Sequence, residues 1–153
     1  MMVDRAISAS LSIVAAMFVI GADVPSSYRL SPQQAVMNAA ESPSGVSGVF
    51  EFAVRSGGED YHGFYLNSEH DYRDPRNLTV ALTPAVNQAL LRRFGSAPTT
   101  YLLGHTIAVR GTARKTRIDF IADGCPTGKY YYQTHLRLTR PDDLTVDGER
   151  PHA

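Results

Sequence analysis

Alternating apolar residues constrain the fold of this chain more than any other feature. In the segment 46–56, Phe50, Phe52 and Val54 share one face of an extended chain, while charged residues occupy the other face. A period of two places every second side chain on the same side of a strand. The segment is therefore predicted to be a half-buried strand.

Five segments are predicted to be strands on this basis: 46–56, 61–68, 77–83, 105–121 and 130–139. Gly57 and Gly58, between the first and the second, are expected to form the tight turn of a hairpin. Gly111 is expected to mark a bend or bulge within the fourth strand. The segment "ADGCPTGK", residues 122–129, is expected to be the turn before the last strand.

Two other segments have helical spacing. Ser31 is a candidate N-cap, with Pro32 at the first helical position and Gln34 three residues after the cap, so a helix is predicted over 32–41. The segment "PAVNQALLRRFG" repeats apolar residues at a spacing of four and ends at Gly95, which predicts a second helix. The order is therefore helix, three strands, helix, two strands.

Five strands with one helix between the third and the fourth is the order of the OB-fold, a small and partly open barrel. The sequence also resembles the OB-fold domains of secreted bacterial proteins, which carry "F-L-N" on strand two, "N-F-T-V" on strand three and "G-K-x-x-x-V-x-G" on strand four. Here strand three reads "NLTV", with Leu78 for phenylalanine, and strand four reads "GHTIAVRG", with His105 for lysine. The resemblance covers about residues 46–146 and brings no catalytic set.

The expected fold is mostly β: a five-stranded OB-fold-like barrel with a helix between strands 3 and 4 and an extra N-terminal helix. The expected divisions are residues 23–45 for the N-terminal helix and linker, 46–147 for the OB-fold-like domain, and 148–153 for a disordered tail. The last strand, "KYYYQTHLRLT", is longer and richer in tyrosine than in the resembling domains. The resemblance therefore implies a fold for this chain but not the ligand preference of those domains.

Residues 1–22 are predicted to be a signal peptide. Arg5 precedes an uncharged run from Ala6 to Ala22, which is shorter than the roughly 20 apolar residues that a membrane span needs. The alternative is an uncleaved anchor, and only that alternative brings the protein into contact with a membrane. The protein is accordingly expected to be exported, either periplasmic or secreted.

Charge and cysteine content narrow the classes of function. Fifteen Lys and Arg balance fifteen Asp and Glu, so there is no strong nucleic-acid signal. Cys125 is the single cysteine and cannot form an internal disulfide; it is either unpaired or joins two chains. Neither a G-x-S-x-G nor an H-x-x-x-H pattern occurs, so no catalytic residue, metal or cofactor is assigned.

The stretch "YLNSEHDYRDPRNLTVAL", residues 65–82, has three interpretations. Its Asn, Asp and Pro residues favour a structured turn. Its tyrosines and arginines also suit a binding surface, with Tyr72 for stacking and Arg73 and Arg76 for anions. A metal site at Glu69, His70, Asp71 and Asp74 is the third, although the spacing matches no EF-hand loop.

Binding residues are also expected on the strands. Tyr61 and Tyr65 share a face of the second strand, and Arg110, Arg114, Lys115 and Arg137 form a basic rim; the alternative is that the tyrosines only cover the edge of the core. The predicted function is an exported, non-catalytic OB-fold binding module for a protein, a glycan or an oligonucleotide. The alternative is a nucleic-acid-binding or nucleic-acid-processing accessory protein. The predicted ligand-binding residues are Tyr61, Tyr65, Tyr72, Arg73, Arg76, Arg110 and Arg114.

Overall fold

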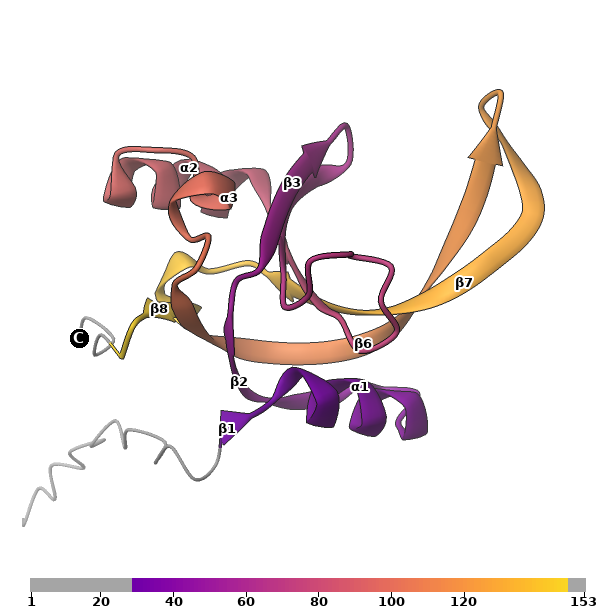
Figure 1. The fold of residues 1–153 in the computed structure, drawn as a ribbon, viewed down its shortest axis with the longest axis horizontal. Helices are drawn as coiled ribbons and strands as arrows, with labels where there is room; N and C mark the ends of the chain where they lie inside the picture. Colours follow the sequence, from indigo (N-terminus) through magenta and orange to yellow (C-terminus); the bar gives the residue numbers. More distant parts are fainter. Residues whose placement is uncertain (1–28, 149–153) are drawn as a thin grey trace, which may run out of the picture.

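The computed structural model describes residues 29–148, which are mostly β (Figure 1). Within them the strands are β1 Arg29–Leu30, β2 Val46–Ala53, β3 Ser56–Asp60, β4 Gly63–Asn67, β5 Leu78–Leu82, β6 Thr106–Ala122, β7 Cys125–Leu138 and β8 Leu144–Val146. The helices of the same part are α1 Pro32–Glu41, α2 Pro84–Phe94, α3 Pro98–Tyr101 and the 3-10 helix η2 Pro141–Asp143. The predicted signal peptide and residues 149–153 of the predicted tail lie outside the described residues.

The strands form one open, mixed sheet in the order β1-β2-β6-β7-β5-β4-β3, and β8 pairs with β6. The β1–β2 and β5–β7 pairs are parallel, and the others are antiparallel. This corrects the expectation of a five-stranded barrel, because the described residues form eight strands and the sheet is open. Among residues 29–148, no helix is long and apolar enough to cross a membrane.

The predicted first strand, 46–56, ends earlier than expected: β2 stops at Ala53, and after Val54 and Arg55 a second strand, β3, begins at Ser56. The backbone N–H of Val54 donates to the carbonyl of His105, whereas that of Arg55 donates to the carbonyl of Asn67 (both 2.9 Å). Within two residues, the backbone thus stops hydrogen-bonding to the chain next to β6 and begins to hydrogen-bond to β4. A continuous period of two in the sequence does not reveal this change of partner.

The predicted glycine turn is wrong, because Gly57 and Gly58 lie within β3. The chain reverses at residues 61–62, where the carboxylate of Asp60 accepts hydrogen bonds from the backbone N–H groups of His62 and Gly63. A Cβ at Gly57 would lie 2.4 Å from the carbonyl oxygen of Thr99. The glycine is therefore needed for the close approach of α3.

The two predicted helices are present at the expected positions. Ser31 Oγ accepts from the N–H of Gln34 (3.3 Å), and Gln34 Oε1 accepts from the N–H of Ser31 (2.8 Å), which forms a capping box at α1. Gly95 ends α2 in the left-handed conformation (φ 73°), and its N–H donates to the carbonyl of Leu91. Ala35 and Ala39 on α1 are buried, so α1 packs tightly against β2 and β6.

The core lies on the inner face of the sheet. Phe50, Phe52 and Val54 are buried as their alternation predicts. They pack with Leu66, Leu78, Val80, Leu82, Ile107, Val109, Leu136 and Leu138. A Cβ at Gly111 would lie 3.0 Å from Leu136, so this glycine leaves room for a core side chain of β7.

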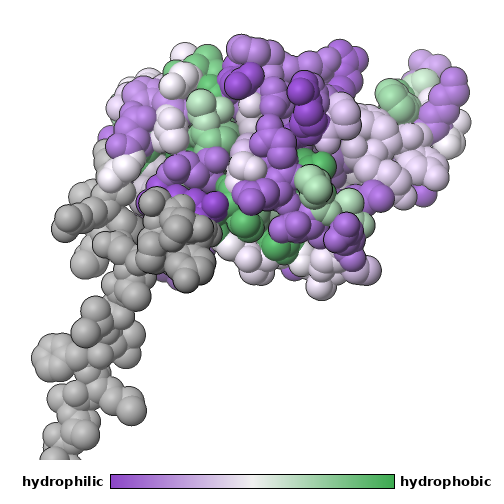
Figure 2. All heavy atoms as spheres, turned by 60° about the horizontal axis from the view of Figure 1, so that its bottom comes forward, coloured by the Kyte–Doolittle hydropathy of each residue, from purple (hydrophilic) through white to green (hydrophobic). Residues whose placement is uncertain are grey.

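The distal parts of β6 and β7, residues 114–133, form a two-stranded arm whose far end stands clear of the rest of the sheet (Figure 1). The expected turn at 122–129 is shorter than predicted: only Asp123 and Gly124 reverse the chain, and Cys125 begins β7. Figure 2 shows the arm projecting at the right of the molecule, mostly pale, with a green apolar spot near its end.

Candidate ligand-binding cleft

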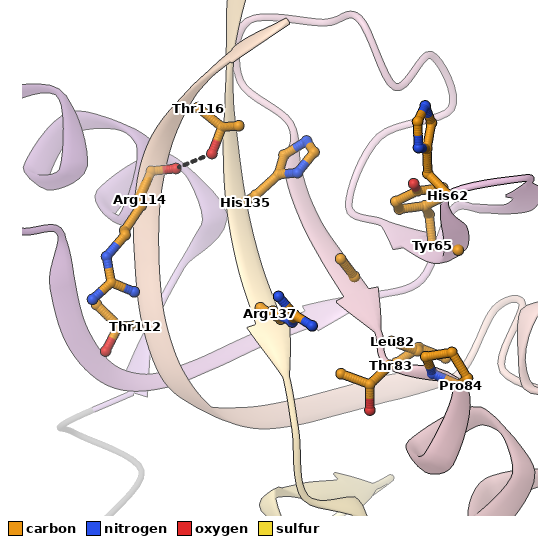
Figure 3. A pocket seen from close by; sticks show the side chains of 12 residues that line it. His62, Tyr65, Leu82, Thr83, Pro84, Thr112, Arg114, Thr116, His135 and Arg137 are labelled. Atoms are coloured by element: carbon orange, nitrogen blue, oxygen red, sulfur yellow. Dashed lines mark hydrogen bonds between the residues drawn. The ribbon is translucent and has the colours of Figure 1, made fainter.

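A cleft of about 480 Å³ lies on the outer face of the sheet, across β4, β5, β6 and β7. Strand alternation positions its side chains: Tyr65 precedes the buried Leu66, and His135 and Arg137 flank the buried Leu136. Figure 3 shows Tyr65 and His62 on one side of the cleft and Arg114 on the other, with His135 and Arg137 between them. The full lining is His62, Gly63, Tyr65, Ala81, Leu82, Thr83, Pro84, Thr112, Arg114, Thr116, His135 and Arg137.

The lining carries positive charge without any carboxylate. Arg114 lies directly opposite His135 in the β6–β7 pair, and Arg137 lies opposite Ala81 in the β7–β5 pair. Neither arginine forms an ion pair with any of residues 29–148. No Asp or Glu lines the cleft. The two guanidinium groups are therefore available to bind an anion.

His135 is a neutral polar group in this cleft at pH 7. Burial lowers the pKa of its imidazole. Its Nε2 lies 2.7 Å from Oε1 of Gln133, and because an amide oxygen only accepts, Nε2 carries the proton. The amide nitrogen of Gln133 donates in turn to the carbonyl of Tyr72 and to the hydroxyl of Tyr131, both at 3.1 Å. Gln133 thus links the segment between β4 and β5, through Tyr72, to His135 in the cleft.

Tyr65 presents its ring to the cleft with its hydroxyl already bound. The hydroxyl donates to Oδ1 of Asp60 at 3.2 Å. Burial, together with the negative charge of Asp60, raises the pKa of Tyr65. The phenol therefore remains neutral, and its ring suits an apolar or stacking contact with a ligand.

The hydroxyl groups of the cleft are held in hydrogen bonds that do not involve histidine. Thr116 donates to the carbonyl of Arg114 (3.3 Å), and the hydroxyls of Thr112 and Ser47 share a bond of 2.8 Å. The hydroxyl of Thr83 accepts from the backbone at the start of α2. None of these cleft hydroxyls is therefore hydrogen-bonded to an imidazole in the described part of the chain.

Of the predicted binding residues, the structure brings Tyr65 and Arg114 together in the cleft. Tyr61 lies in the turn after β3, not on the second strand, and is 88% exposed. Arg110 is exposed on β6 but outside the cleft, and the three remaining candidates lie in the chain between β4 and β5: Tyr72, Arg73 and Arg76. His62 and His135 were missed. The position of His135 could have been predicted, because the apolar Leu136 and Leu138 define the buried face of the strand and His135 lies on the opposite face.

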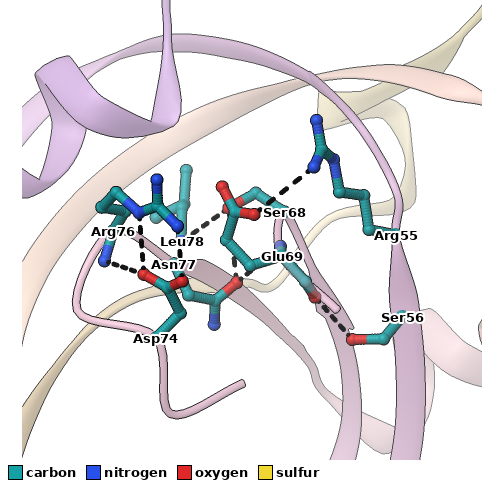
Figure 4. Close-up of polar contacts among 8 residues, drawn as sticks. All are labelled: Arg55, Ser56, Ser68, Glu69, Asp74, Arg76, Asn77 and Leu78. Atoms are coloured by element: carbon teal, nitrogen blue, oxygen red, sulfur yellow. Dashed lines mark hydrogen bonds and ion pairs between the residues drawn. The ribbon is translucent and has the colours of Figure 1, made fainter. Parts of the chain in front are cut away.

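The segment 68–77, which contains most of the charges of the stretch discussed above, is a structured turn (Figure 4). Asp71 accepts from the backbone and the guanidinium of Arg73. Asp74 accepts the same kinds of bond from Arg76, and these bonds lower the pKa of Asp74 to about 2. The charges that suggested an anion site are therefore paired with each other.

The third interpretation of this segment, a metal site, has no matching geometry. Glu69 faces Arg55 at 3.5 Å, while Asp71 and Asp74 bind arginines as described above. No group of three or more His, Cys, Asp or Glu side chains within 29–148 is arranged to hold a metal ion.

Neither a family model nor a curated protein matches this sequence. Function is therefore inferred from the cleft and from the order of the strands.

Proposed function

We propose that the protein is a non-catalytic binding module of the OB type, and that its cleft holds an anionic group of its ligand. The single observation that carries this proposal is the pair of arginines, Arg114 and Arg137, in a cleft without a carboxylate. Two arginines in one cleft without a carboxylate can both contact an anionic group, and guanidinium groups bind such groups with charge-assisted hydrogen bonds.

The order of the strands supports the OB type. β4 and β5 are antiparallel, β5 and β7 are parallel, and β6 and β7 are antiparallel, with α2 between β5 and β6. β2 pairs with β6 and β3 pairs with β4, although only two residues separate β2 from β3, so this stretch of chain connects strands from opposite ends of the strand order. In OB-folds, ligands bind over the second and third strands. If β4 and β5 are the counterparts of those strands, as the proposal holds, Tyr65 on β4 and Ala81 on β5 lie on the ligand-binding face.

The proposed ligand is a protein, a glycan or an oligonucleotide with an anionic group. Export of the chain is part of the proposal and is supported only by the sequence of residues 1–22. An oligonucleotide is the second candidate, because the ring of Tyr65 beside two arginines suits stacking and phosphate contacts together. The balanced charge of the chain weighs against it.

Amide NMR titration of the full chain tests the proposal. The probes are a short single-stranded oligonucleotide and a sulfated oligosaccharide, each at low salt and at about 0.2 M salt, where phosphate contacts weaken. We expect salt-sensitive shifts at Tyr65, His135 and Arg137 with at least one probe. An absence of shifts with both probes at low salt would remove the proposed anion site.

A matched pair of variants separates the cleft from general surface charge. R114A/R137A removes both cleft arginines and is expected to weaken binding about 150-fold or more, because each of the two charge-assisted bonds contributes at least about 1.5 kcal/mol. R110A removes an exposed arginine of the same strand outside the cleft and is expected to change affinity less than about threefold. Equal losses in the two variants would mean that the cleft is not the site.

A further inference from the structure

The arm leaves one edge of β6 without a strand partner. β2 pairs with β6 from Thr106 to Ala113, and β8 pairs with it only from Ile107 to Val109. Beyond Ala113, β7 is the only strand of the described part of the chain that pairs with β6. The other edge of the arm strand is open to pairing with a strand of another chain.

The arm also exposes more apolar surface than a ribbon of two strands normally carries alone. Phe120, Ile121, Tyr130 and Tyr132 are each about half exposed, at 49%, 53%, 49% and 49%. A two-stranded ribbon is at best marginally stable in water, and it becomes stable when further strands or a packed face are added.

The β7 edge of the arm is poorly suited to pairing. Pro126 has no backbone N–H, and Gly128 has a positive φ of 80°. The register of the two arm strands also shifts between Asp119 and Ile121, where β7 contains the additional residues. The β6 edge has neither a proline nor a positive φ between residues 114 and 122. An incoming strand is therefore expected along β6.

The charges along the β6 edge are self-complementary. In antiparallel pairing of two identical strands about Ile118, Arg117 lies opposite Asp119 of the second copy, and the reverse pair forms by symmetry. Centring the pair on Arg117 instead would place two guanidinium groups opposite each other. Centring it on Asp119 would place two carboxylates opposite each other. The other two registers also form unlike pairs, Lys115 with Asp119 in one and Lys115 with Asp123 in the other, but each places like charges opposite each other at its centre. Of the three registers, only the one centred on Ile118 pairs unlike charges without a like-charge pair.

We propose that two copies of this chain associate through the β6 edges of their arms, antiparallel and centred on Ile118, to form a four-stranded intermolecular sheet. Within one chain, Arg117 Nη2 lies 2.8 Å from Asp119 Oδ1, and its guanidinium lies over the ring of Tyr130 at 4.0 Å. These contacts hold Arg117 and Asp119 on one face of the arm, in position to meet their counterparts. Because the interface is two-fold, it closes as a dimer and does not propagate.

Charge exchange between two variants tests the interface. R117D makes both positions acidic and D119R makes both basic, so each variant places like charges opposite each other in its own dimer. We expect each variant to raise the dimer dissociation constant about 30-fold, because two favourable cross-strand pairs become repulsive. An equimolar mixture of the two variants restores both unlike pairs and is expected to form a heterodimer. The intrachain Arg117–Asp119 pair is absent from both variants, so only the interchain contact explains this recovery.

Sedimentation equilibrium and native mass spectrometry of the full chain, with reductant present, give the oligomeric state. A wild-type chain that remains monomeric up to about 1 mM overturns the proposal. A dimer seen only without reductant would be a Cys125 disulfide and would also overturn the proposal. The same holds for a dimer that both single variants leave intact, and for an equimolar mixture of the variants that stays monomeric. Hydrogen exchange gives a second measurement, since backbone amides between 115 and 121 should lose protection when the wild-type protein is diluted.

Discussion

Replacing Asn77 with alanine is expected to destabilise the protein by about 3 kcal/mol, because its side chain satisfies several buried groups. Asn77 is 2% exposed. Its Nδ2 donates to the carbonyl of Tyr72 (3.2 Å) and to Oγ1 of Thr79 (2.9 Å). Its Oδ1 accepts from Ser68 Oγ (3.3 Å) and from the N–H of Glu69 (3.1 Å). The side chain thus joins the segment 68–77 to the start of β5 (Figure 4).

The expected magnitude follows from the partners that remain without it. Thr79 still donates to Asn67, and the carbonyl of Tyr72 still accepts from Gln133. The N–H of Glu69 and the hydroxyl of Ser68 each lose an acceptor. An unsatisfied buried donor costs about 1–3 kcal/mol, so two such groups cost about 3 kcal/mol when the hydroxyl finds partial compensation.

Urea denaturation followed by far-UV circular dichroism measures this loss. The matched control is R76A in the same segment, which removes an exposed ion pair and is expected to cost much less than N77A. A loss below about 1 kcal/mol for N77A, or equal losses in the two variants, would refute the view that buried hydrogen bonds hold this segment.

Three further predictions concern packing and pH. G111A places a Cβ 3.0 Å from Leu136 and is expected to cost about 1–3 kcal/mol in urea denaturation, whereas G58A meets no atom within 4 Å and should be nearly neutral; equal costs would contradict the packing argument. Arg76 lowers the pKa of Asp74 to about 2, so the stabilisation by this carboxylate is present above the unfolded-state value of about 3.9 and is lost as the pH falls toward 2. D74N should therefore have a urea midpoint that varies less than the wild-type midpoint between about pH 4 and pH 2, and parallel profiles would contradict this. Burial lowers the pKa of His135 below the ordinary histidine value of 6.5, so the imidazole becomes charged only at a pH below 6.5. Binding of a sulfated oligosaccharide, measured by NMR, should therefore strengthen as the pH falls below 6.5. H135Q should show a smaller increase, and an unchanged increase would assign the effect to another group.

Local signals in the sequence predicted the secondary structure well where neighbouring residues decide it. The capping residues Ser31 and Gln34 predicted the start of α1, and Gly95 predicted the end of α2. The alternation of Phe50 and Phe52 predicted which face of β2 is buried. These features depend on residues within about four positions, so periodicity and capping chemistry are sufficient to detect them.

The candidate site was predicted only in part. Tyr65 and Arg114 were predicted to bind ligand, and the cleft contains both. The charges of segment 68–77 suggested an anion-binding surface, but its two arginines are paired with aspartates two positions earlier. Charge in a sequence does not reveal whether a partner lies nearby. Arg137 was expected in the basic rim, but that it has no ion-pair partner among residues 29–148 and lies in the cleft with Arg114 is known only from the neighbouring strands.

The sequence alone determined the β-rich class, the two main helices and the buried faces of the strands, since burial follows a local period that each segment carries by itself. The tertiary structure decided which strands pair, and with it the open sheet, the cleft and the arm. Gly57 illustrates the difference: its type suggests a turn, but the carbonyl of Thr99, far along the chain, requires a glycine within a strand. Such contacts form between residues that are distant in sequence, and no local pattern encodes which residue will be the neighbour.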